Sequence, residues 1–343
     1  MSEIRYDRLF DRHVIIAPER LHRPTNQSNR VERRASQRVC PFCEGNEQLT
    51  PPEIYALRES ESFANEAGWK TRVVPNLFKA LQIEAPYRHN YSFFEHWDGF
   101  GAHEILIDTP QHYTSMTQWS EEAVINWLKT LRQRFNDLKQ DTRIVSLSLF
   151  KNEGVEAGGT QPHSHTQVIA MPIMPKAKRQ QYEHLFNYYK EYNSSLLATM
   201  IQNELEDEAK RIVSANEKFT AFCPYASSYP FEVIISSQQA LGELGDFKDE
   251  NIKLLATILL DVLHRLKKQL GTLEFNLMLS TPPLHANTLG AELFHALHAS
   301  SRFYIRIAPR IYKYGGFEHE SEVYINPLAP EMAAKLLRES DYV

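Results

Sequence analysis

Cysteine is scarce in this sequence, with three among 343 residues. An odd and small number of cysteines argues against a disulfide scaffold of the kind that small secreted proteins use. Long apolar runs are also missing, and none approaches the roughly 20 residues of a membrane-spanning helix. The polar start, Met1-Ser2-Glu3-Ile4-Arg5, lacks the apolar core of a signal peptide. These absences lead us to expect a soluble, cytoplasmic protein.

The sequence has no excess of basic residues. Its formal net charge is -5 at pH 7, with both signs mixed along the chain. Nucleic-acid-binding domains carry a basic patch or stripe, because phosphate contacts supply much of their affinity. The composition therefore gives no support for a nucleic-acid partner. With 42% hydrophobic residues, the chain is long enough for one large or two ordinary domains with real cores.

Two of the three cysteines form the motif Cys40-Pro41-Phe42-Cys43. Such a tight knuckle can place two thiolates on one tetrahedral metal ion, and zinc is the ordinary occupant. The alternative is a redox pair, which would follow a strand and open a helix in a thioredoxin-like unit. Residues 29–48 have instead the composition of a polar loop. The zinc interpretation is therefore favoured.

The stretch from Lys151 to Pro175 combines a glycine-rich loop with a strand pattern. Glycines in its first part allow tight bends that bring backbone N–H groups close to an anion. Beyond the loop the residues alternate, so that His163, His165 and Gln167 share one face of a strand. This arrangement is suited to holding and attacking a phosphate. The competing interpretation is a surface or metal-binding histidine pair, which arises easily by chance in a chain with 14 histidines.

The chain repeats one order of elements: strand, helix, strand, loop, strand. The first copy has strands near 103–108, 143–150 and 163–171, with an amphipathic helix after Ser120. The second has strands near 231–235, 275–279 and 302–309, with a helix from Asp249 to Gly271. This order indicates an internal duplication. We expect an α+β fold of two tandem halves, 1–175 and 176–343, each a mostly antiparallel sheet with packed helices.

The second copy lacks the reactive residues of the first. Arg302 stands where the first copy has His165, Tyr304 where it has Gln167, and Ala226 where it has Cys43. One chain should therefore hold one active site, in its first half. Between the copies, residues 176 to about 214 have the pattern of a long polar helical stretch.

The Cys-x-x-Cys knuckle, the duplication and His163-Ser164-His165-Thr166-Gln167 together resemble the galactose-1-phosphate uridylyltransferase branch of the histidine triad superfamily. The similarity spans nearly the full length of the chain. It includes the segment Val14 to Pro24, Asn76, Thr109-Pro110-Gln111-His112, Lys151-Asn152-Glu153-Gly154 and Gly316-Phe317-Glu318. The resemblance implies two histidine-triad-like halves. The first would be catalytic and hold the zinc site, and the degenerate second would support the sugar phosphate and the dimer.

Roles of family residues pass to matching positions only. The resemblance implies that His165 is the covalent nucleophile and that Gln167 hydrogen-bonds the phosphoryl oxygens. It implies that Asn152, Gly159 and Thr160 contact the phosphate, that Arg20, Arg23 and Asn76 belong to the nucleotide site, and that Glu318 lies near the sugar phosphate. It also implies that the zinc ligands are Cys40, Cys43, His112 and His163. Family members are dimers whose sites borrow residues across the interface. We therefore expect a homodimer that binds a nucleotide sugar and a hexose 1-phosphate.

The sequence also departs from the family pattern. Leu77 stands where uridylyltransferases typically have Asp, and Val323-Tyr324-Ile325-Asn326-Pro327 is more similar to the branch that contains plant ADP-glucose phosphorylase. Histidines that build a second metal site in some members are missing, with Arg302, Tyr304 and Arg306 nearby instead. Four protein ligands close the tetrahedron of a zinc ion and leave no position for a reactive water. We expect one structural zinc and no second metal.

The residue types favour a transferase. An imidazole is largely neutral at pH 7 and attacks phosphorus without a separate base. A sugar 1-phosphate leaves already ionised and needs no general acid. An amide such as Gln167 donates hydrogen bonds but does not titrate, whereas related hydrolases have a third histidine there. We further expect N–H groups around Gly158, Gly159 and Thr160 to stabilise charge on the phosphoryl oxygens.

The leading hypothesis is a ping-pong nucleotidyltransferase of galactose metabolism that moves uridylyl groups between glucose 1-phosphate and galactose 1-phosphate. An adenylyl version, ADP-sugar phosphorylase or dinucleoside polyphosphate phosphorylase, is the alternative. The rival from another class is a zinc-stabilised module that binds nucleotides or nucleic acid without turnover. That module would need a basic face, which the negative net charge disfavours.

Overall fold

The computed structural model describes residues 2–22, 39–59, 61–285 and 290–340. In chain order the strands are β1 (Glu3–Asp7), β2 (Arg12–Ile16), β3 (Tyr55–Arg58), β4 (Trp69–Pro75), β5 (His89–Asn90), β6 (His96–Trp97), β7 (Ala102–Ile107), β8 (Ser146–Glu153), β9 (His165–Met171), β10 (Ile212–Ala215), β11 (Phe219–Phe222), β12 (Val233–Ser237), β13 (Phe275–Leu279), β14 (Tyr304–Pro309) and β15 (Tyr324–Asn326). The helices are α1 (Glu121–Leu138), α2 (Lys176–Tyr192), α3 (Leu196–Glu206), α4 (Asp249–Leu270), α5 (Ala291–Ser300), α6 (Gly316–Ser321) and α7 (Pro330–Arg338), with short 3₁₀ turns at Pro18–His22, Glu47–Leu49, Met116–Gln118 and Leu244–Asp246. In this part of the chain, no helix is apolar over a stretch long enough to cross a bilayer.

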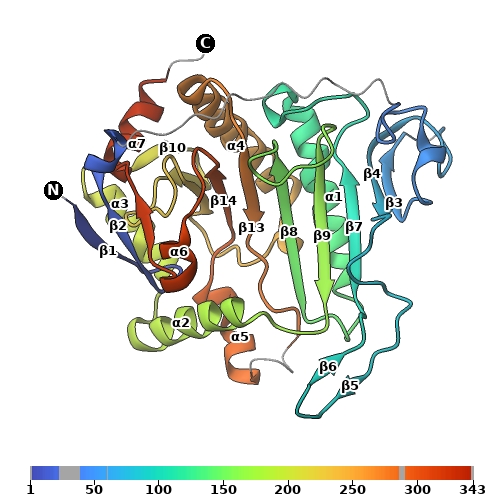
Figure 1. Cartoon of the computed structure of the whole chain (residues 1–343), viewed down its shortest axis with the longest axis horizontal. Coiled ribbons are helices and arrows are strands. Elements are labelled where there is room, and N and C mark those ends of the chain that lie inside the picture. The colour runs from blue at the N-terminus through green and yellow to red at the C-terminus, as the bar shows by residue number, and fades with distance from the viewer. Residues whose placement is uncertain (1, 23–38, 60, 286–289, 341–343) are drawn as a thin grey trace.

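Ten strands form one sheet at the centre of the molecule (Figure 1). Its order is β10-β11-β12-β14-β13-β8-β9-β7-β4-β3, and every neighbouring pair is antiparallel. A smaller sheet, β1-β2-β15, lies beside it, and β15 pairs with β2 in parallel. Strands β5 and β6 form a hairpin that projects from the body below β7 in this view. The predicted α+β fold of two mostly antiparallel halves is confirmed.

The two halves join edge to edge through β8 and β13. In this pair Asn152 lies opposite Asn276, and Phe150 lies opposite Met278. The sequence predicts a sheet for each half but does not show that the two sheets merge. Because β13 pairs with β8, a strand of the second half lies next to the strand that leads into the glycine-rich loop.

Side chains on the central strands alternate between a closed and an open side. On β9, Thr166, Val168 and Ala170 are buried, and the last two lie in the main core with the apolar faces of α1 and α4. Both helices lie behind the sheet in Figure 1. Their apolar stripes follow the helical spacing, and Ser120 caps α1 by accepting a hydrogen bond from the N–H of Ala123.

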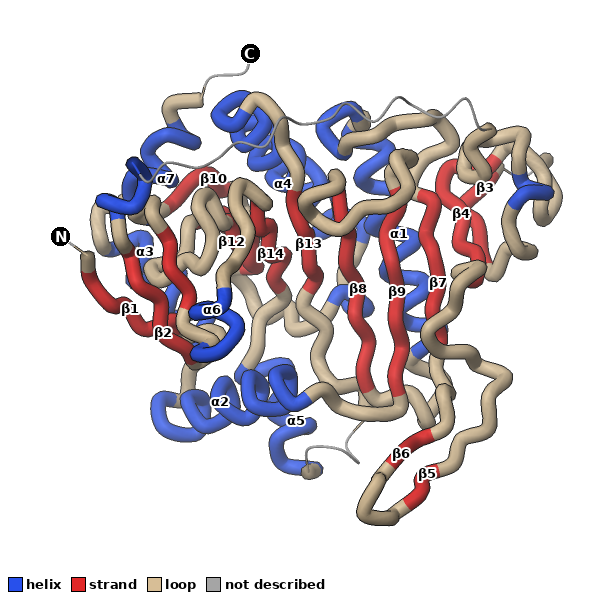
Figure 2. Tube along the Cα trace, in the orientation of Figure 1, coloured by secondary structure: helices blue, strands red, loops and turns tan. Residues whose placement is uncertain are grey.

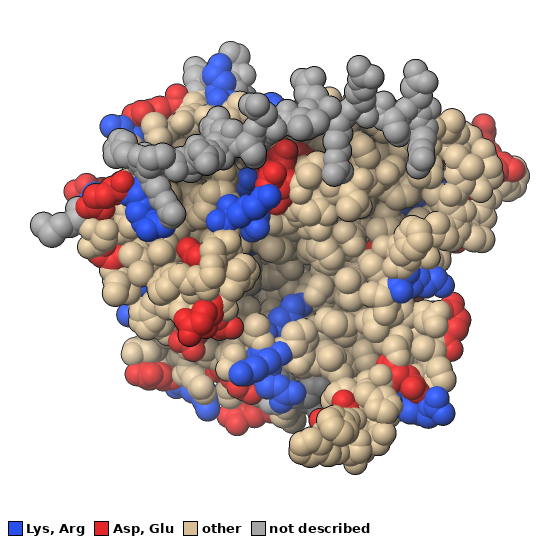
Figure 3. Space-filling view, viewed as in Figure 1, with Lys and Arg blue, Asp and Glu red and all other residues tan. Residues whose placement is uncertain are grey.

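The other side of the sheet is covered over only part of its width. Over β12 and β14 it is closed by a second apolar cluster that includes residues of α2, α3 and α5. Over β13, β8, β9 and β7 no helix crosses it in the view of Figure 2. We call this half-buried side of β13, β8, β9 and β7 the open face. The space-filling view shows a hollow there with basic side chains along its edge (Figure 3).

The segment 176–214 is not one helical stretch. Helix α2 ends at Tyr192 because Asn193 adopts the left-handed conformation, with φ of 50°. Helix α3 begins after Ser195, and β10 then takes Ile212 and Val213 into the sheet beside β11. Both residues are β-branched and buried, which favours a strand. The prediction of one long helical stretch was wrong at residues 193–195 and again beyond Glu206.

A buried ion pair fixes α1 to the sheet, and its loss should be costly. Two nitrogens of Arg134 lie 2.9 and 2.7 Å from the two carboxylate oxygens of Glu104, and both side chains are 5% exposed. Arg134→Met should lower the free energy of unfolding by about 3–5 kcal/mol, because it leaves a buried carboxylate without a partner. Urea unfolding measures this change.

Arg132 provides the matched control, since its partner Asp249 is 57% exposed. Loss of the Arg132–Asp249 ion pair in Arg132→Met should lower the free energy of unfolding by less than about 1 kcal/mol. Equal losses in the two variants would contradict the role given to the Arg134–Glu104 pair.

Candidate active site and metal centre

Four predicted metal ligands come together from distant parts of the chain. The ligand atoms of Cys40, Cys43, His112 and His163 all lie within 4.8 Å of one another. The sulfur atoms of Cys40 and Cys43 each lie 3.6 Å from Nδ1 of His163, and Cys43 Sγ lies 3.2 Å from Nδ1 of His112. Among the described residues, no other group of His, Cys and acidic side chains is arranged to hold a metal.

This donor set fits a zinc ion. Tetrahedral zinc, with Zn–S of about 2.3 Å and Zn–N of about 2.0 Å, separates sulfur from nitrogen by about 3.5 Å. His163 Nε2 donates to the carbonyl of Thr109 at 2.9 Å, which leaves Nδ1 to face the thiols. Burial lowers the pKa of His163 to about 4, so the ring is the neutral form that binds metal. Burial and the neighbouring Cys40 raise the pKa of Cys43 to about 11, a cost that a divalent cation would offset.

His165 begins β9 two residues after His163, one of the four candidate metal ligands. Its Nδ1 donates to the carbonyl of His163 at 2.8 Å, so the lone pair of Nε2 is left for chemistry. The side chain is 9% exposed, and the ring of Phe42 packs against it with centroids 5.6 Å apart. Burial lowers the pKa of His165, and the nearby charge of Lys151 lowers it further. The ring is therefore neutral, and its Nε2 carries a lone pair.

A buried lysine holds the start of β9 from the core side. Lys151 Nζ donates to Asp108 Oδ2 and to Ser164 Oγ, each at 2.7 Å, and to the carbonyl of His165 at 3.1 Å. Asp108 also accepts from Thr166 Oγ1 at 2.8 Å. The lysine and aspartate are 1% and 0% exposed. Sequence reasoning gave neither residue a role, although a charged pair inside apolar strands is the signal that could have found them.

Gln167 is oriented by a histidine on the neighbouring strand. The N–H of Ala80 donates to His103 Nδ1 at 3.1 Å, which places the ring proton on Nε2. That Nε2 lies 3.2 Å from Gln167 Oε1 and donates to it, so the amide N–H groups of Gln167 remain for a ligand. Asn76 Nδ2 also lies 3.0 Å from this nitrogen, but both groups are donors in this tautomer and do not pair; the oxygen of Asn76 accepts from the N–H of Phe78 at 2.9 Å. The structure thus brings the predicted residues Asn76 and Gln167 together beside His103, which sequence reasoning did not single out.

The glycine-rich loop folds back on itself. Gly154 and Gly158 have φ of 89° and 84°, a region that favours glycine. A Cβ on Gly159 would lie 2.8 Å from the carbonyl oxygens of Asn152 and Gly154. The N–H groups of Gly158 and Gly159 donate to Val155 and Gly154 within the loop. Both N–H groups are therefore already hydrogen-bonded within the loop, which corrects the expectation that they face a phosphate.

Other groups of this loop are left for a ligand. Thr160 is exposed, and within the described ranges no backbone carbonyl accepts from its N–H or from that of Gln161. The predicted phosphate contacts at Asn152 and Thr160 therefore lie on one loop and its supporting strand, which enters from the same sheet as His165.

Asn276, from the second half, sets the orientation of Asn152. Its Nδ2 donates to the carbonyl of Ala157 at 2.8 Å and to Asn152 Oδ1 at 2.9 Å. A backbone carbonyl can only accept, so it fixes which end of the Asn276 amide faces this way. Asn152 must then offer its oxygen to Asn276 and turn its Nδ2 elsewhere. No local motif marks Asn276, and only the register of β8 and β13 reveals it.

The remaining predicted substrate residues lie apart from His165. Arg20 is exposed on the 3₁₀ turn after β2, and Glu318 is on α6, where it accepts from the N–H of Gly315 at 2.9 Å. Burial raises the pKa of Tyr312, the charge of Glu318 raises it further, and the charge of Arg20 lowers it. Among the described residues no contact joins either of them to the His165 group. Arg23 lies outside the described residues.

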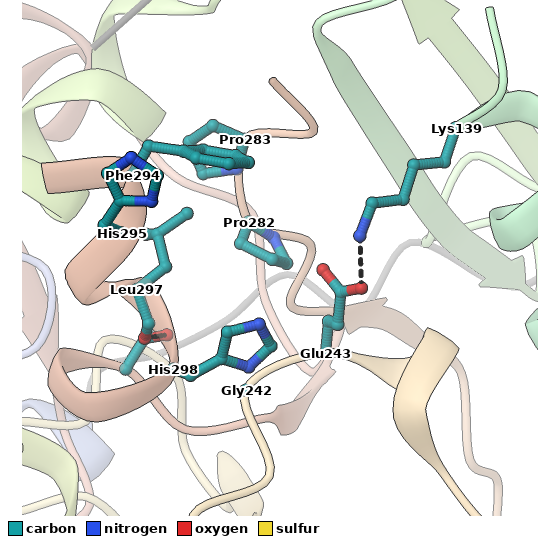
Figure 4. Close-up of a pocket in the computed structure, with 10 residues that line it drawn as sticks. Lys139, Gly242, Glu243, Pro282, Pro283, Phe294, His295, Leu297 and His298 are labelled. Atoms are coloured by element: carbon teal, nitrogen blue, oxygen red, sulfur yellow. Dashed lines mark hydrogen bonds and ion pairs between the residues drawn. The ribbon is translucent and has the colours of Figure 1, made fainter. Parts of the chain in front are cut away.

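Arg302 and a pocket beside α5 lie away from the His165 group. Arg302 stands where the duplication predicts a nucleophile, but its Nη1 donates to carbonyls at the end of α5, including that of Ser301 at 2.8 Å. Nearby, Figure 4 shows a cavity of about 230 Å³ in which Lys139 Nζ lies 2.6 Å from Glu243, with Phe294, His295 and His298 opposite. No residue predicted for catalysis, substrate or metal lines this cavity.

Loss of one thiol should unfold the metal centre before it changes any chemistry. Cys43→Ser removes a strong ligand from a cluster that holds together the knuckle, the loop after β7 and the start of β9. We expect a lower zinc content by atomic absorption and a lower Tm. A variant that keeps a full equivalent of zinc, or loses zinc without a change of Tm, would contradict a structural metal centre.

Two sequence models of one family match the chain. They describe the N-terminal domain of galactose-1-phosphate uridyl transferase, over residues 1–175, and its C-terminal domain, over residues 178–340. Among curated proteins, ADP-glucose phosphorylase of Arabidopsis thaliana is 28% identical over 98% of this chain and 92% of its own length. Galactose-1-phosphate uridylyltransferase of Thermotoga maritima is 26% identical over 99% of both.

Solved structures agree with the sequence comparisons. The crystal structure of an ADP-glucose phosphorylase from Arabidopsis thaliana with bound ADP-glucose superposes with a TM-score of 0.83, at 27% identity and over 100% of both chains. A uridylyltransferase structure has a TM-score of 0.74 over 99% of this chain and 98% of its own, at 20% identity, which supports the fold alone. With both halves matched in order over nearly the whole length, the chain belongs to the galactose-1-phosphate uridyl transferase family of nucleotidyl-transferring enzymes.

Proposed function

We propose that this protein transfers a nucleoside monophosphate in two steps through a covalent adduct of His165. In the first step Nε2 of His165 forms a bond to the α-phosphorus of a nucleoside diphosphate hexose. The bond from that phosphorus to the bridging oxygen breaks, and hexose 1-phosphate leaves with the electron pair. In the second step a phosphate oxygen of the acceptor attacks the same phosphorus and releases the ring.

One observation carries this proposal above the others. The proton of His165 is committed to the carbonyl of His163, so the buried ring keeps a free Nε2. The carbonyl also stabilises the positive charge that the ring gains on attack. A chain with an imidazole held in this way, in a family of nucleotidyl-transferring enzymes, does not support the rival binding module without turnover.

Gln167 and Asn152 supply hydrogen bonds rather than protons. The N–H groups of Gln167 are free because its oxygen accepts from His103. Nδ2 of Asn152 is free because its oxygen accepts from Asn276. Donors that are oriented before the reaction stabilise the charge that develops on the phosphoryl oxygens. Since neither amide titrates, the leaving group must depart as an anion, which suits a sugar 1-phosphate.

Zinc, bound by Cys40, Cys43, His112 and His163, would hold the start of β9 in place and take no part in the bond changes. The residues that it braces include His163, whose carbonyl orients the nucleophile. Cytoplasmic location and a homodimer remain part of the proposal. A dimer would allow Arg20 and Glu318, which lie apart from His165, to serve the site of the second subunit.

Two nucleotide donors are compatible with this function, one carrying uridine and one carrying adenosine. Sequence reasoning put uridylyl transfer to galactose 1-phosphate first. The exposed Leu77 beside Asn76, and the similarity to ADP-glucose phosphorylase in both sequence and structure, favour an adenylyl donor with phosphate as acceptor. We therefore propose ADP-glucose as the first donor to test and UDP-glucose as the second.

The test is transfer of radiolabel from the α-phosphate of each nucleotide sugar to the protein, without an acceptor. We expect label on the wild-type protein from one donor and release of an equal amount of glucose 1-phosphate. His165→Asn should take up no label while keeping the fold, because Asn fits the same position. Absence of label from both donors, or label that persists in His165→Asn, would refute the proposal.

Asn276 should matter through Asn152. Asn276→Ala should slow adduct formation about tenfold, roughly the value of one hydrogen bond near 1.4 kcal/mol, and Asn152→Ala by about 10²–10³. The double variant should be no slower than Asn152→Ala, because the two residues act in series. Rapid-quench measurement of the labelling rate gives these values.

Asn136 is the matched control, because its Nδ2 also donates between the two halves, to the carbonyl of Gly245 at 3.3 Å, away from the site. Asn136→Ala should leave the labelling rate unchanged. Additive losses in the double variant would show that Asn276 does not act through Asn152.

A further inference from the structure

A second pocket lies at the edge of the open face, between α2 and the strands of the second half. It has a volume of about 130 Å³ and is lined on its polar side by Lys178, Gln181, Ser280, Thr281, Tyr304 and Arg306. Arg306 lies in one register row with Met278, Phe150 and Gln167. With strands about 4.8 Å apart, Arg306 and Gln167 are separated by about 14 Å across the sheet. The pocket is therefore separate from the His165 group.

The lining of this pocket is cationic without an acid of its own. Lys178 and Arg306 both contribute to it, and no Asp or Glu does, although the buried carboxylates of Glu232 and Asp7 lie behind the lining and act on Arg306. Lys178 Nζ donates to two neutral oxygens, the carbonyl of Leu147 and Thr281 Oγ1, the latter at 2.6 Å. Burial lowers the pKa of Lys178 to about 8, with no acidic neighbour to raise it again. A buried cation with neutral partners is stabilised by an anion.

Arg306 is only partly satisfied. Its Nε lies 2.6 Å from Glu232 Oε1, whereas its buried Nη2 has no hydrogen-bond partner among the residues that the structure describes. The other oxygen of Glu232 accepts from the N–H groups of Ser228 and Tyr229. Since most buried polar groups are paired, the free Nη2 is itself a sign of a missing acceptor.

Two hydroxyl groups of the lining also have protons to donate. Tyr304 accepts at its hydroxyl oxygen from Gln181 Nε2 at 3.0 Å, and within the described part of the chain its O–H donates to no other group. Ser280 Oγ accepts from the N–H of Tyr304 at 2.8 Å, which leaves its hydrogen free as well. Lys178 has three N–H groups and spends two of them. The pocket thus offers donors of four residues, two of them charged.

We propose that this pocket binds a tetrahedral oxyanion, either inorganic phosphate or the phosphate group of a monoester, at a site distinct from the one at His165. Donors without acceptors exclude a cation and suit an anion with several oxygens. The second half would then have lost its nucleophile but kept, from different residues, an anion site on the corresponding strand β14.

The test is isothermal titration with inorganic phosphate at constant ionic strength, held with chloride. Asn152→Ala serves as the background, because it removes a predicted phosphate contact at the catalytic site and none in this pocket. In that background phosphate should still bind. Adding Lys178→Met should weaken binding tenfold or more, about the effect of a charge-assisted hydrogen bond.

Lys176→Met is the charge-matched control, since Lys176 is exposed on the same helix and does not line the pocket. It should change the affinity less than about twofold, as expected of a solvated charge. Tyr304→Phe keeps the packing of the ring and removes one donor, so it provides a second variant should Lys178→Met fold poorly. It should weaken binding by about two- to tenfold.

Glucose 1-phosphate in a parallel titration separates the two sources of the anion. Binding of both ligands assigns the site to the phosphate group itself, and binding of inorganic phosphate alone assigns it to the free anion. Absence of binding to the Asn152→Ala protein at millimolar concentrations of both ligands would overturn the proposal. Equal affinity in the background, Lys178→Met and Tyr304→Phe proteins would overturn it as well. Neither result depends on whether His165 forms an adduct.

Discussion

The hydrogen bond from His165 Nδ1 to the carbonyl of His163 connects the four candidate metal ligands to the ring that we propose as the nucleophile. The side chain of His163 faces the two thiols, while its backbone carbonyl, two residues from His165, fixes the tautomer of the second ring. Lys151 holds the same segment from the core side. The start of β9 is therefore held on two sides, which fixes the orientation of the His165 ring. Because the ring is neutral, no general base is needed to remove a proton from it.

The second half of the chain completes the first instead of repeating it. Helices α2, α3 and α5 close the face over β12 and β14, while the equivalent face over β8, β9 and β7 stays open. At the junction, Asn276 reaches across from β13 and ties the glycine-rich loop to Asn152. A strand that carries no catalytic residue thus contributes to the geometry of the site. Arg302, which the predicted duplication aligns with His165, donates to carbonyls at the end of α5.

The features predicted correctly from the sequence are those that depend on short-range residue patterns. The apolar periodicity of α1 and α4 gave their limits closely, and the His-x-His alternation gave the common side of His165 and Gln167. The four metal ligands were named from resemblance to a family, and the structure brings their ligand atoms together. Asn276, His103 and the Lys151–Asp108 pair were missed, because each depends on which strands become neighbours. These contacts join residues 43, 64 and 124 positions apart, and such pairing is set by the packing of the whole sheet, which no short window of sequence contains.

Mass spectrometry of the quenched reaction tests the central claim most directly. After a brief incubation with nucleotide sugar and digestion at alkaline pH, where a phosphoramidate survives, the fragment 152–176 carries both histidines of the motif. The account predicts that this fragment gains the mass of one nucleotidyl group, which is a nucleoside monophosphate less one water, with fragmentation locating it on His165. An adduct on His163, on another residue, or on none would contradict it.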